Sequence, residues 1–210
     1  MTNEDILRGL NPAQRAAVEA YNEPSLIIAG AGSGKTRVLT TRIAYMLAQG
    51  VPAYSILALT FTNKAANEIM VRLAKMFPDE EQIASEIWTG TFHSVCLRIL
   101  RKYGDRLGYR DDFSIYDTED SKKAISSAMK TLNIDEKAFP VKSVMGIISD
   151  AKNRLMTPEM LAEEGDKDFR IAKIARIYAQ YQKDMQSSNV LDFDDIIMKT
   201  VELLRNNEDV

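Results

Sequence analysis

Residues 25–36, with the sequence Ser-Leu-Ile-Ile-Ala-Gly-Ala-Gly-Ser-Gly-Lys-Thr, constrain the fold of this chain more than any other stretch. The apolar run 26–28 predicts a buried strand, and the glycine-rich segment after it predicts a tight turn. A segment with helical periodicity then begins at Lys35. Strand, glycine-rich turn and helix in this order are the layout of a phosphate-binding P-loop, which indicates an α/β fold.

The three glycines explain why such a loop can hold a polyphosphate. Gly30, Gly32 and Gly34 tolerate positive φ and have no Cβ, so successive backbone N–H groups can curl around an anion at a helix N-terminus. The alternative is a glycine-rich turn before an ordinary helix. The strand expected before the loop and the helix expected after it favour the phosphate site.

Two side chains follow the glycines. Lys35 is placed to reach the β and γ phosphates of a nucleotide, and the Thr36 hydroxyl is placed to bind Mg²⁺. The strict pattern begins with glycine, whereas this chain has Ala29 at that position. We treat residues 29–36 as the predicted P-loop.

Composition excludes some classes and leaves others open. The chain has 210 residues, 45% of them hydrophobic, which is enough for a packed core. A net charge of −3 gives no global signal for nucleic acid, so such binding would need a local basic surface. The single cysteine, Cys96, indicates a small buried residue in a reducing compartment. No stretch approaches the roughly 18 apolar residues of a membrane span, so we expect a cytoplasmic protein without membrane contact.

Local signals place the first helices. Asn11, Pro12 and Gln14 predict a helix over 11–21, in which the Gln14 amide reaches back to the Asn11 backbone. The helix that begins at Lys35 is stopped by Gly50 and the proline after it.

Two further strand and helix units are expected. Residues 56–62 predict a second buried strand that joins the first through a right-handed βαβ connection in a parallel sheet. A helix opens at Asn63, and residues 87–93 predict a strand and loop before another helix. Helices that begin at the carboxyl edge of such a sheet offer free N–H groups to a ligand.

The second half of the chain has a different character. Residues 98–110 are the most basic part, which is either a solvated helix face or a surface for a phosphodiester backbone. Residues 113–190 show helical segments without βαβ alternation and predict a separate helical subdomain. In the segment after it, Asp192 or Asp194 is predicted to cap a last helix, in preference to forming a metal site.

Taken together, five stretches resemble one family. They are residues 10–18 with Gln14, the P-loop, the segment 59–66 (Leu-Thr-Phe-Thr-Asn-Lys-Ala-Ala), the segment 90–94 (Gly-Thr-Phe-His-Ser) and the segment 191–197 (Leu-Asp-Phe-Asp-Asp-Ile-Ile). Their types and order resemble the opening motifs of the UvrD, PcrA and Rep group of superfamily 1 DNA helicases, with PcrA-like members the nearest. The resemblance covers essentially the whole chain.

The resemblance implies a partial RecA-like P-loop domain over residues 1–112, an inserted all-helical subdomain over 113–190, and a return helix over 191–210. It also implies an ATP site in which Gln14 reads the adenine edge and Arg37 lies along the ring. The remaining ATP contacts would come from the P-loop, that is from Ala29, Gly30, Ala31, Gly32, Ser33, Gly34, Lys35 and Thr36.

For DNA, the resemblance implies that Phe61 stacks on a base of a single strand. The track would be lined by Thr62, Asn63, Lys64, Thr91 and His93. From burial statistics alone, the sequence favours Phe61 as a core residue of a buried strand, and a structural residue is the alternative for His93.

The implied activity is ATP-driven 3′-to-5′ movement on single-stranded DNA, in repair or replication, by a monomer that engages single strands and junctions with duplex and that has possible repair-protein partners. In the family, the Walker B acids that hold Mg²⁺ and a second RecA-like domain follow this part. Residues 1–210 contain no run of four apolar residues followed by an acidic pair; 113–117 come nearest. We therefore expect residues 1–210 alone to bind nucleotide without steady hydrolysis. The alternatives are a non-catalytic DNA- or protein-binding module and a small-molecule P-loop kinase.

Overall fold

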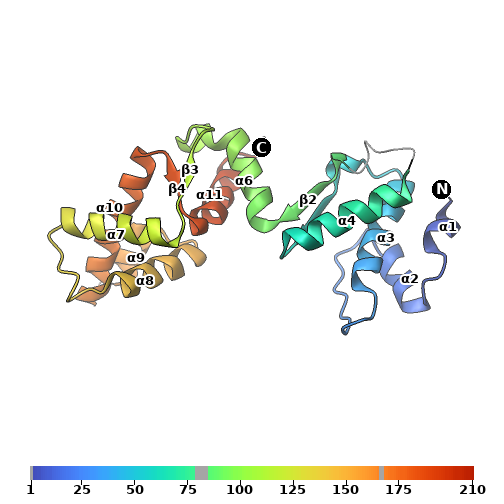
Figure 1. The fold of residues 1–210 in the computed structure, drawn as a ribbon, viewed down its shortest axis with the longest axis horizontal. Coiled ribbons are helices and arrows are strands. Elements are labelled where there is room, and N and C mark those ends of the chain that lie inside the picture. The colour runs from blue at the N-terminus through green and yellow to red at the C-terminus, as the bar shows by residue number, and fades with distance from the viewer. Residues whose placement is uncertain (1, 79–84, 166–167) are drawn as a thin grey trace. The chain divides into compact units, whose positions relative to one another are not determined.

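The computed structural model of the chain describes residues 2–78, 85–165 and 168–210. It is mostly helical with short parallel strands, which confirms a mixed α/β protein. The backbone divides into two compact units (Figure 1). Unit 1 ends at Val95, and unit 2 runs from Cys96 to Val210.

Unit 1 contains a two-stranded sheet and the helices around it. Within the described residues, its elements are α1 (Asn3–Leu7), α2 (Pro12–Glu19), α3 (Lys35–Ala48), the 3₁₀ helix η1 (Ala53–Ser55), β1 (Leu57–Thr60), α4 (Asn63–Met76) and β2 (Trp88–Thr91). The helix α6 (Phe92–Tyr103) begins in unit 1 and ends in unit 2.

The sheet of unit 1 is parallel, as predicted. Leu57 pairs with Trp88 and Thr60 pairs with Thr91, and α4 lies between the two strands in sequence. Apolar residues of α3, β1 and α4 form its core; the buried members are Ile43, Ala53, Ile56, Ala58, Ile69, Leu73 and Ile87. The register places the carboxyl ends of β1 and β2 side by side, and α4 and α6 begin close after them.

The predicted strand at 26–28 is wrong. This segment has no regular secondary structure, and the side chains of Leu26, Ile27 and Ile28 are 87%, 43% and 91% exposed. A strand needs a neighbour to pair its backbone N–H and C=O groups. Among the described residues, the sheet of unit 1 contains only β1 and β2, and neither pairs with this run.

The predicted helix starts are confirmed where local caps specify them. The Asn11 side chain accepts a hydrogen bond from the Gln14 backbone N–H, and the Gln14 side chain accepts one from the Asn11 backbone. After α3, Gly50 adopts a φ of +86°, a left-handed conformation that few other residues reach without strain.

Unit 2 is built from helices and one short strand pair. After α6 come η2 (Gly104–Leu107), β3 (Ser114–Ile115), α7 (Thr118–Thr131), α8 (Val141–Asn153), α9 (Pro158–Glu164), α10 (Phe169–Ser187), β4 (Val190–Leu191) and α11 (Phe193–Asn206). Its largest core cluster joins α7, α8 and α10 around the buried residues Met129, Val144, Ile148, Ile174 and Tyr178.

The strands β3 and β4 bring the two ends of the α7–α10 segment together. Ser114 pairs with Val190 and Ile115 with Leu191, in parallel. Next to this pair, the side chain of Asn189 accepts a hydrogen bond from the Arg110 backbone N–H at 2.9 Å. The chain therefore enters and leaves the four helices at one place (Figure 1).

Two other expectations concern burial. Cys96 is half-buried, not buried as predicted, because it lies near the edge of the α6–α11 core; burial raises the pKa of its thiol. Within the three described ranges, no helix has the length and apolar content needed to cross a membrane.

Candidate functional site

The P-loop has the curled backbone that the glycines predict. Gly32 and Gly34 adopt φ values of +74° and +85°, where an L side chain is strained. Gly30 has no positive φ, and a Cβ built on it would meet no atom within 4 Å. Two of the three glycines are therefore needed for the curl in this conformation.

The curled P-loop leads directly into α3. Gly34 is the N-cap of this helix, and no side chain caps it. The first N–H groups of a helix have no partner within the helix and carry the positive end of its dipole. The α3 N-terminus therefore has the donors and the charge that a phosphate group requires.

The Lys35 amine is hydrogen-bonded to the backbone of the P-loop. It donates hydrogen bonds to the backbone oxygens of Ala29 at 3.1 Å and Gly30 at 2.7 Å. The Ser33 hydroxyl also donates to the Gly30 oxygen, at 2.7 Å. Because an ammonium group has three donors and these two bonds use two of them, one donor remains for a phosphate oxygen.

The Gln14 amide links α2 to the P-loop. Its Nε2 donates to the Ser33 backbone oxygen at 3.0 Å, while its Oε1 accepts from the Asn11 backbone N–H at 3.0 Å. A Cβ on Gly34 would lie 3.1 Å from the same Nε2. The helix-cap role of Gln14 is therefore confirmed, and its adenine-reading role stays a prediction.

Arg37 and Thr36 complete this part of the site. The Arg37 Nη2 donates to the Arg8 backbone oxygen at 3.2 Å, and so the guanidinium lies beside the turn that contains Gly9. Thr36 is half-buried in the first turn of α3. The structure thus brings Gln14, residues 29–36 and Arg37 into one region of unit 1.

Phe61 lies at the carboxyl end of β1 and is 92% exposed, so its interpretation as a core residue is wrong. Its ring lies near that of Phe92 at the start of α6, with centroids 6.1 Å apart and planes inclined by 41°. Sequence reasoning did not assign a role to Phe92. The signal available was its position, directly after β2, in the segment 90–94.

The other predicted DNA residues gather at the same sheet edge. Thr62 caps α4 by accepting from the Ala65 N–H at 3.1 Å, and Thr91 accepts from the Ser94 N–H at 3.2 Å. Asn63 and Lys64 are exposed in the first turn of α4, and His93 is half-buried in the first turn of α6. The register of β1 and β2 therefore places both predicted segments together.

Several residues of the basic run 98–110 have partners within unit 2. The Arg106 guanidinium forms a bidentate ion pair with Asp209 at 2.7 Å, Arg110 pairs with Asp112, and Arg101 donates to the Asp111 backbone oxygen. The Arg101 guanidinium also lies 3.8 Å above the Phe113 ring. These contacts favour the interpretation of this run as a helix face over a surface for phosphodiester groups.

A buried ionic cluster in unit 2 was missed by the sequence reasoning. The Lys152 Nζ lies 2.5 Å from Asp192 Oδ2 and 2.8 Å from Asp195 Oδ1, and all three residues are buried. Tyr181 donates to Asp192 and Gln182 to Asp195, each at 2.8 Å. Asp192 caps α11 as predicted. We refer to Lys152, Asp192 and Asp195 as the ionic cluster.

The two carboxyl groups of the ionic cluster have different pKa shifts. Burial raises the pKa of Asp195 to about 6. Burial acts in the same direction on Asp192, but the Lys152 ammonium and the hydrogen bonds to this carboxylate hold its pKa below the usual value. An amine occupies the space between the acids; no group of three potential metal ligands occurs within the described residues.

Residues 10–210 match the sequence model of the family described as "UvrD/REP helicase N-terminal domain". The chain belongs to the UvrD/REP family. A relative from Staphylococcus epidermidis, named ATP-dependent DNA helicase PcrA, is 46% identical over 199 residues, which are 94% of this chain and 27% of that protein. A relative of the same name from Staphylococcus aureus is 44% identical over 206 residues, which are 98% of this chain and 28% of that protein. The chain therefore spans about a quarter of these two UvrD/REP proteins.

Proposed function

We propose that residues 1–210 are the ATP-binding and single-stranded-DNA-tracking part of an ATP-dependent DNA helicase. The observation that carries this proposal is the P-loop, in which two left-handed glycines lead into the uncapped N-terminus of α3. Membership of the UvrD/REP family, and the name of the two relatives, support the reaction class.

The nucleotide site consists of the residues that unit 1 brings together. The P-loop N–H groups and Lys35 bind the phosphates, the Thr36 hydroxyl binds Mg²⁺, and Gln14 and Arg37 hold the adenine. The donor set fits these groups, since the loop presents backbone N–H groups and an ammonium to which no carboxylate of the described residues is hydrogen-bonded. ATP supplies the free energy for movement along DNA.

The DNA track is the carboxyl edge of β1 and β2. An exposed aromatic ring such as Phe61 can stack on any base, which suits a protein that moves along DNA regardless of sequence. Thr62, Asn63 and Lys64 on one segment, and Thr91 and His93 on the other, contact the strand. In the whole protein we propose 3′-to-5′ movement on single strands and at junctions with duplex DNA, in cytoplasmic repair or replication.

The domain organisation of the proposal follows the family pattern. Residues 1–112 are part of a RecA-like domain, residues 113–190 are a helical insertion, and residues 191–210 return to the RecA-like part. The pairing of β3 with β4 supports this organisation, because it places the start and the end of the insertion next to each other.

A nucleotide titration of residues 1–210 tests the proposal. Lys35→Ala should abolish binding of a fluorescent ATP analogue, because it removes the ammonium from the phosphate site. Lys75→Ala, in the last turn of α4, is the matched control and should bind like the parent chain. Equal binding by the parent chain and Lys35→Ala would contradict the nucleotide site.

The absence of four successive apolar residues followed by an acidic pair predicts a second result for the same 210 residues. They should show no steady ATP hydrolysis with or without single-stranded DNA, since phosphoryl transfer depends on positioned charge. DNA-stimulated turnover at the rates of a complete helicase would refute the proposal that these residues bind ATP without hydrolysing it.

A further inference from the structure

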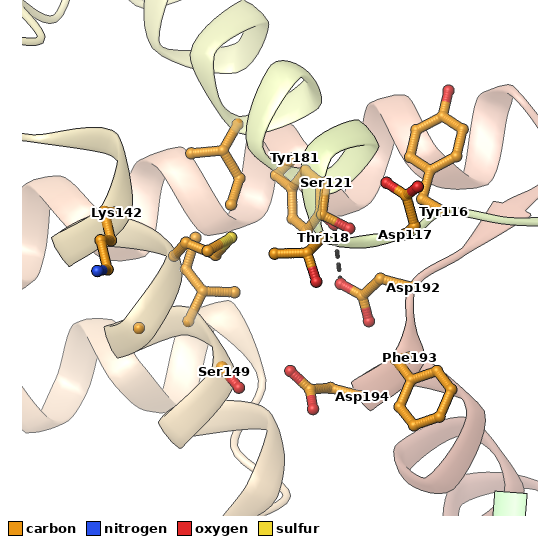
Figure 2. Close-up of a pocket in the computed structure, with 14 residues that line it drawn as sticks. Tyr116, Asp117, Thr118, Ser121, Lys142, Ser149, Tyr181, Asp192, Phe193 and Asp194 are labelled. Carbon is orange, nitrogen blue, oxygen red and sulfur yellow. Dashed lines mark hydrogen bonds between the residues drawn. The ribbon is translucent and has the colours of Figure 1, made fainter.

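A cavity of about 670 Å³ lies in unit 2, bounded by α7, α8, Tyr181 of α10 and the start of α11 (Figure 2). None of the P-loop residues lines it, nor does any predicted DNA residue. Its volume lies in the range of small-molecule sites, which are mostly apolar with a few polar groups in fixed positions. The proposed helicase function leaves this cavity without a role.

The walls of the cavity are apolar on two sides. Ile125 of α7 and the residues Met145 and Ile148 of α8 line it. Gly146 lies between the last two, and a Cβ built on it would meet no atom within 4 Å. Glycine in the middle of a helix is unfavourable for the helix itself, so its place here leaves room for a ligand against the backbone of α8.

The charges around the cavity are predominantly negative. Three carboxylates line it, those of Asp117, Asp192 and Asp194. Asp192 is paired with Lys152, which leaves the carboxylates of Asp117 and Asp194 against the lining ammonium of Lys142. Figure 2 shows the Lys142 amine on the side of the cavity away from Asp192 and Asp194, and the Asp194 carboxylate directed toward the cavity. The field inside the cavity therefore favours a cation.

The three carboxylates differ in how far their oxygens already accept hydrogen bonds. Asp192 accepts from Lys152, Tyr181 and the Asp195 backbone, and so its oxygens are occupied. Asp117 uses Oδ1 to cap α7. Asp194, in contrast, has no hydrogen-bond or ion-pair partner in the part of the chain that the structure describes, although it is half-buried.

We propose that this cavity binds a small organic cation with an apolar body. The ammonium or guanidinium head of such a ligand forms a charge-assisted hydrogen bond with Asp194. Its apolar body lies against Ile125, Met145 and the open backbone at Gly146, where it displaces water from apolar surface.

Three probes with the same phenylpropyl body and different end groups test this proposal on the ¹⁵N-labelled 210-residue chain. They are 3-phenylpropylamine, which is cationic, 3-phenylpropan-1-ol, which is neutral, and 3-phenylpropionate, which is anionic. The amine should shift the backbone resonances of Gly146, Ser149 and Asp194 in a saturable manner. The alcohol should bind with an affinity about tenfold lower than that of the amine, or lower still. The carboxylate should not bind.

Two pairs of variants separate the charge from the space. Asp194→Asn should weaken the amine about tenfold and leave the alcohol unchanged, whereas Glu159→Gln, in the first turn of α9, should change neither. Gly146→Trp should abolish binding by filling the cavity, while Gly146→Ala should retain it. Equal affinity for the amine and the alcohol, an unaffected Asp194→Asn variant, or no saturable shift with the amine would each overturn the proposal.

Discussion

Replacement of Lys152 by methionine tests the ionic cluster. Lys152 is 1% exposed, and its ammonium lies within 2.8 Å of both Asp192 and Asp195. Methionine has a similar length and fills the space of the lysine stem, so the main change is the loss of the positive charge. Two carboxylates then remain in a buried environment, close to each other and without their counter-ion.

The expected loss of stability follows from that geometry. Removal of one partner of a buried ion pair costs about 3–5 kcal/mol, because the remaining charge is buried without compensation. The loss should depend on pH. The pKa of Asp195 is already raised to about 6 by burial, and without Lys152 it rises further. Since the folded-state pKa lies above the unfolded value, protonation restores stability, and the loss in Lys152→Met should shrink as the pH falls from 8 to 5.

Hydrogen exchange read by peptide mass spectrometry suits this chain because it has two units. Peptides from α8, α10 and α11 should exchange about two to four orders of magnitude faster in Lys152→Met at pH 8, up to the limit set by global unfolding. Peptides from unit 1 serve as an internal reference. Lys142→Met, an exposed position on the same helix, should change exchange by less than threefold, within about 0.5 kcal/mol. A Lys152→Met effect below tenfold, or one independent of pH, would refute the reasoning.

Three further predictions concern single positions. Gly146→Ala should stabilise unit 2 by about 0.5–1 kcal/mol in thermal or exchange measurements, since alanine is the better helix former and its Cβ meets no atom. Gly34→Ala should weaken nucleotide binding and cost about 1 kcal/mol or more, because its φ is +85°, whereas Gly30→Ala should be tolerated. Gln14→Glu retains the acceptor for the Asn11 N–H and loses the donor to Ser33. Nucleotide affinity should therefore fall, while α2 should stay folded by circular dichroism. Unchanged affinity would mean that Gln14 acts only as a helix cap.

The features that the sequence predicted correctly are specified by neighbouring residues. The start of α2 follows from Asn11 and Gln14, which are three residues apart, and the start of α11 follows from Asp192 and Asp195 at the same spacing. A cap satisfies backbone N–H groups within one turn, and therefore its partners must be close in sequence. The curl of the P-loop is likewise specified by residues close in sequence, namely its own glycines.

The ionic cluster could not be predicted from residues that are neighbours in the sequence. Lys152 lies in the last turn of α8, where a basic residue is ordinary, and nothing around it indicates burial. Its partner Asp192 is 40 residues away. Only the packing of α8 against the start of α11 brings the two together, and that packing is a property of the whole unit.

The same distinction explains why the strand prediction failed at residues 26–28. An apolar run indicates side chains that need cover, but a strand forms only when another strand pairs with its backbone. Here Leu26 and Ile28 remain almost fully exposed, and Leu57 of β1 is 54% exposed. A two-stranded sheet is marginal by itself and depends on its helices. The run therefore has the composition of a strand without a strand to pair with among the described residues. The P-loop beside it keeps its curl because that curl needs only its own glycines and the N-terminus of α3.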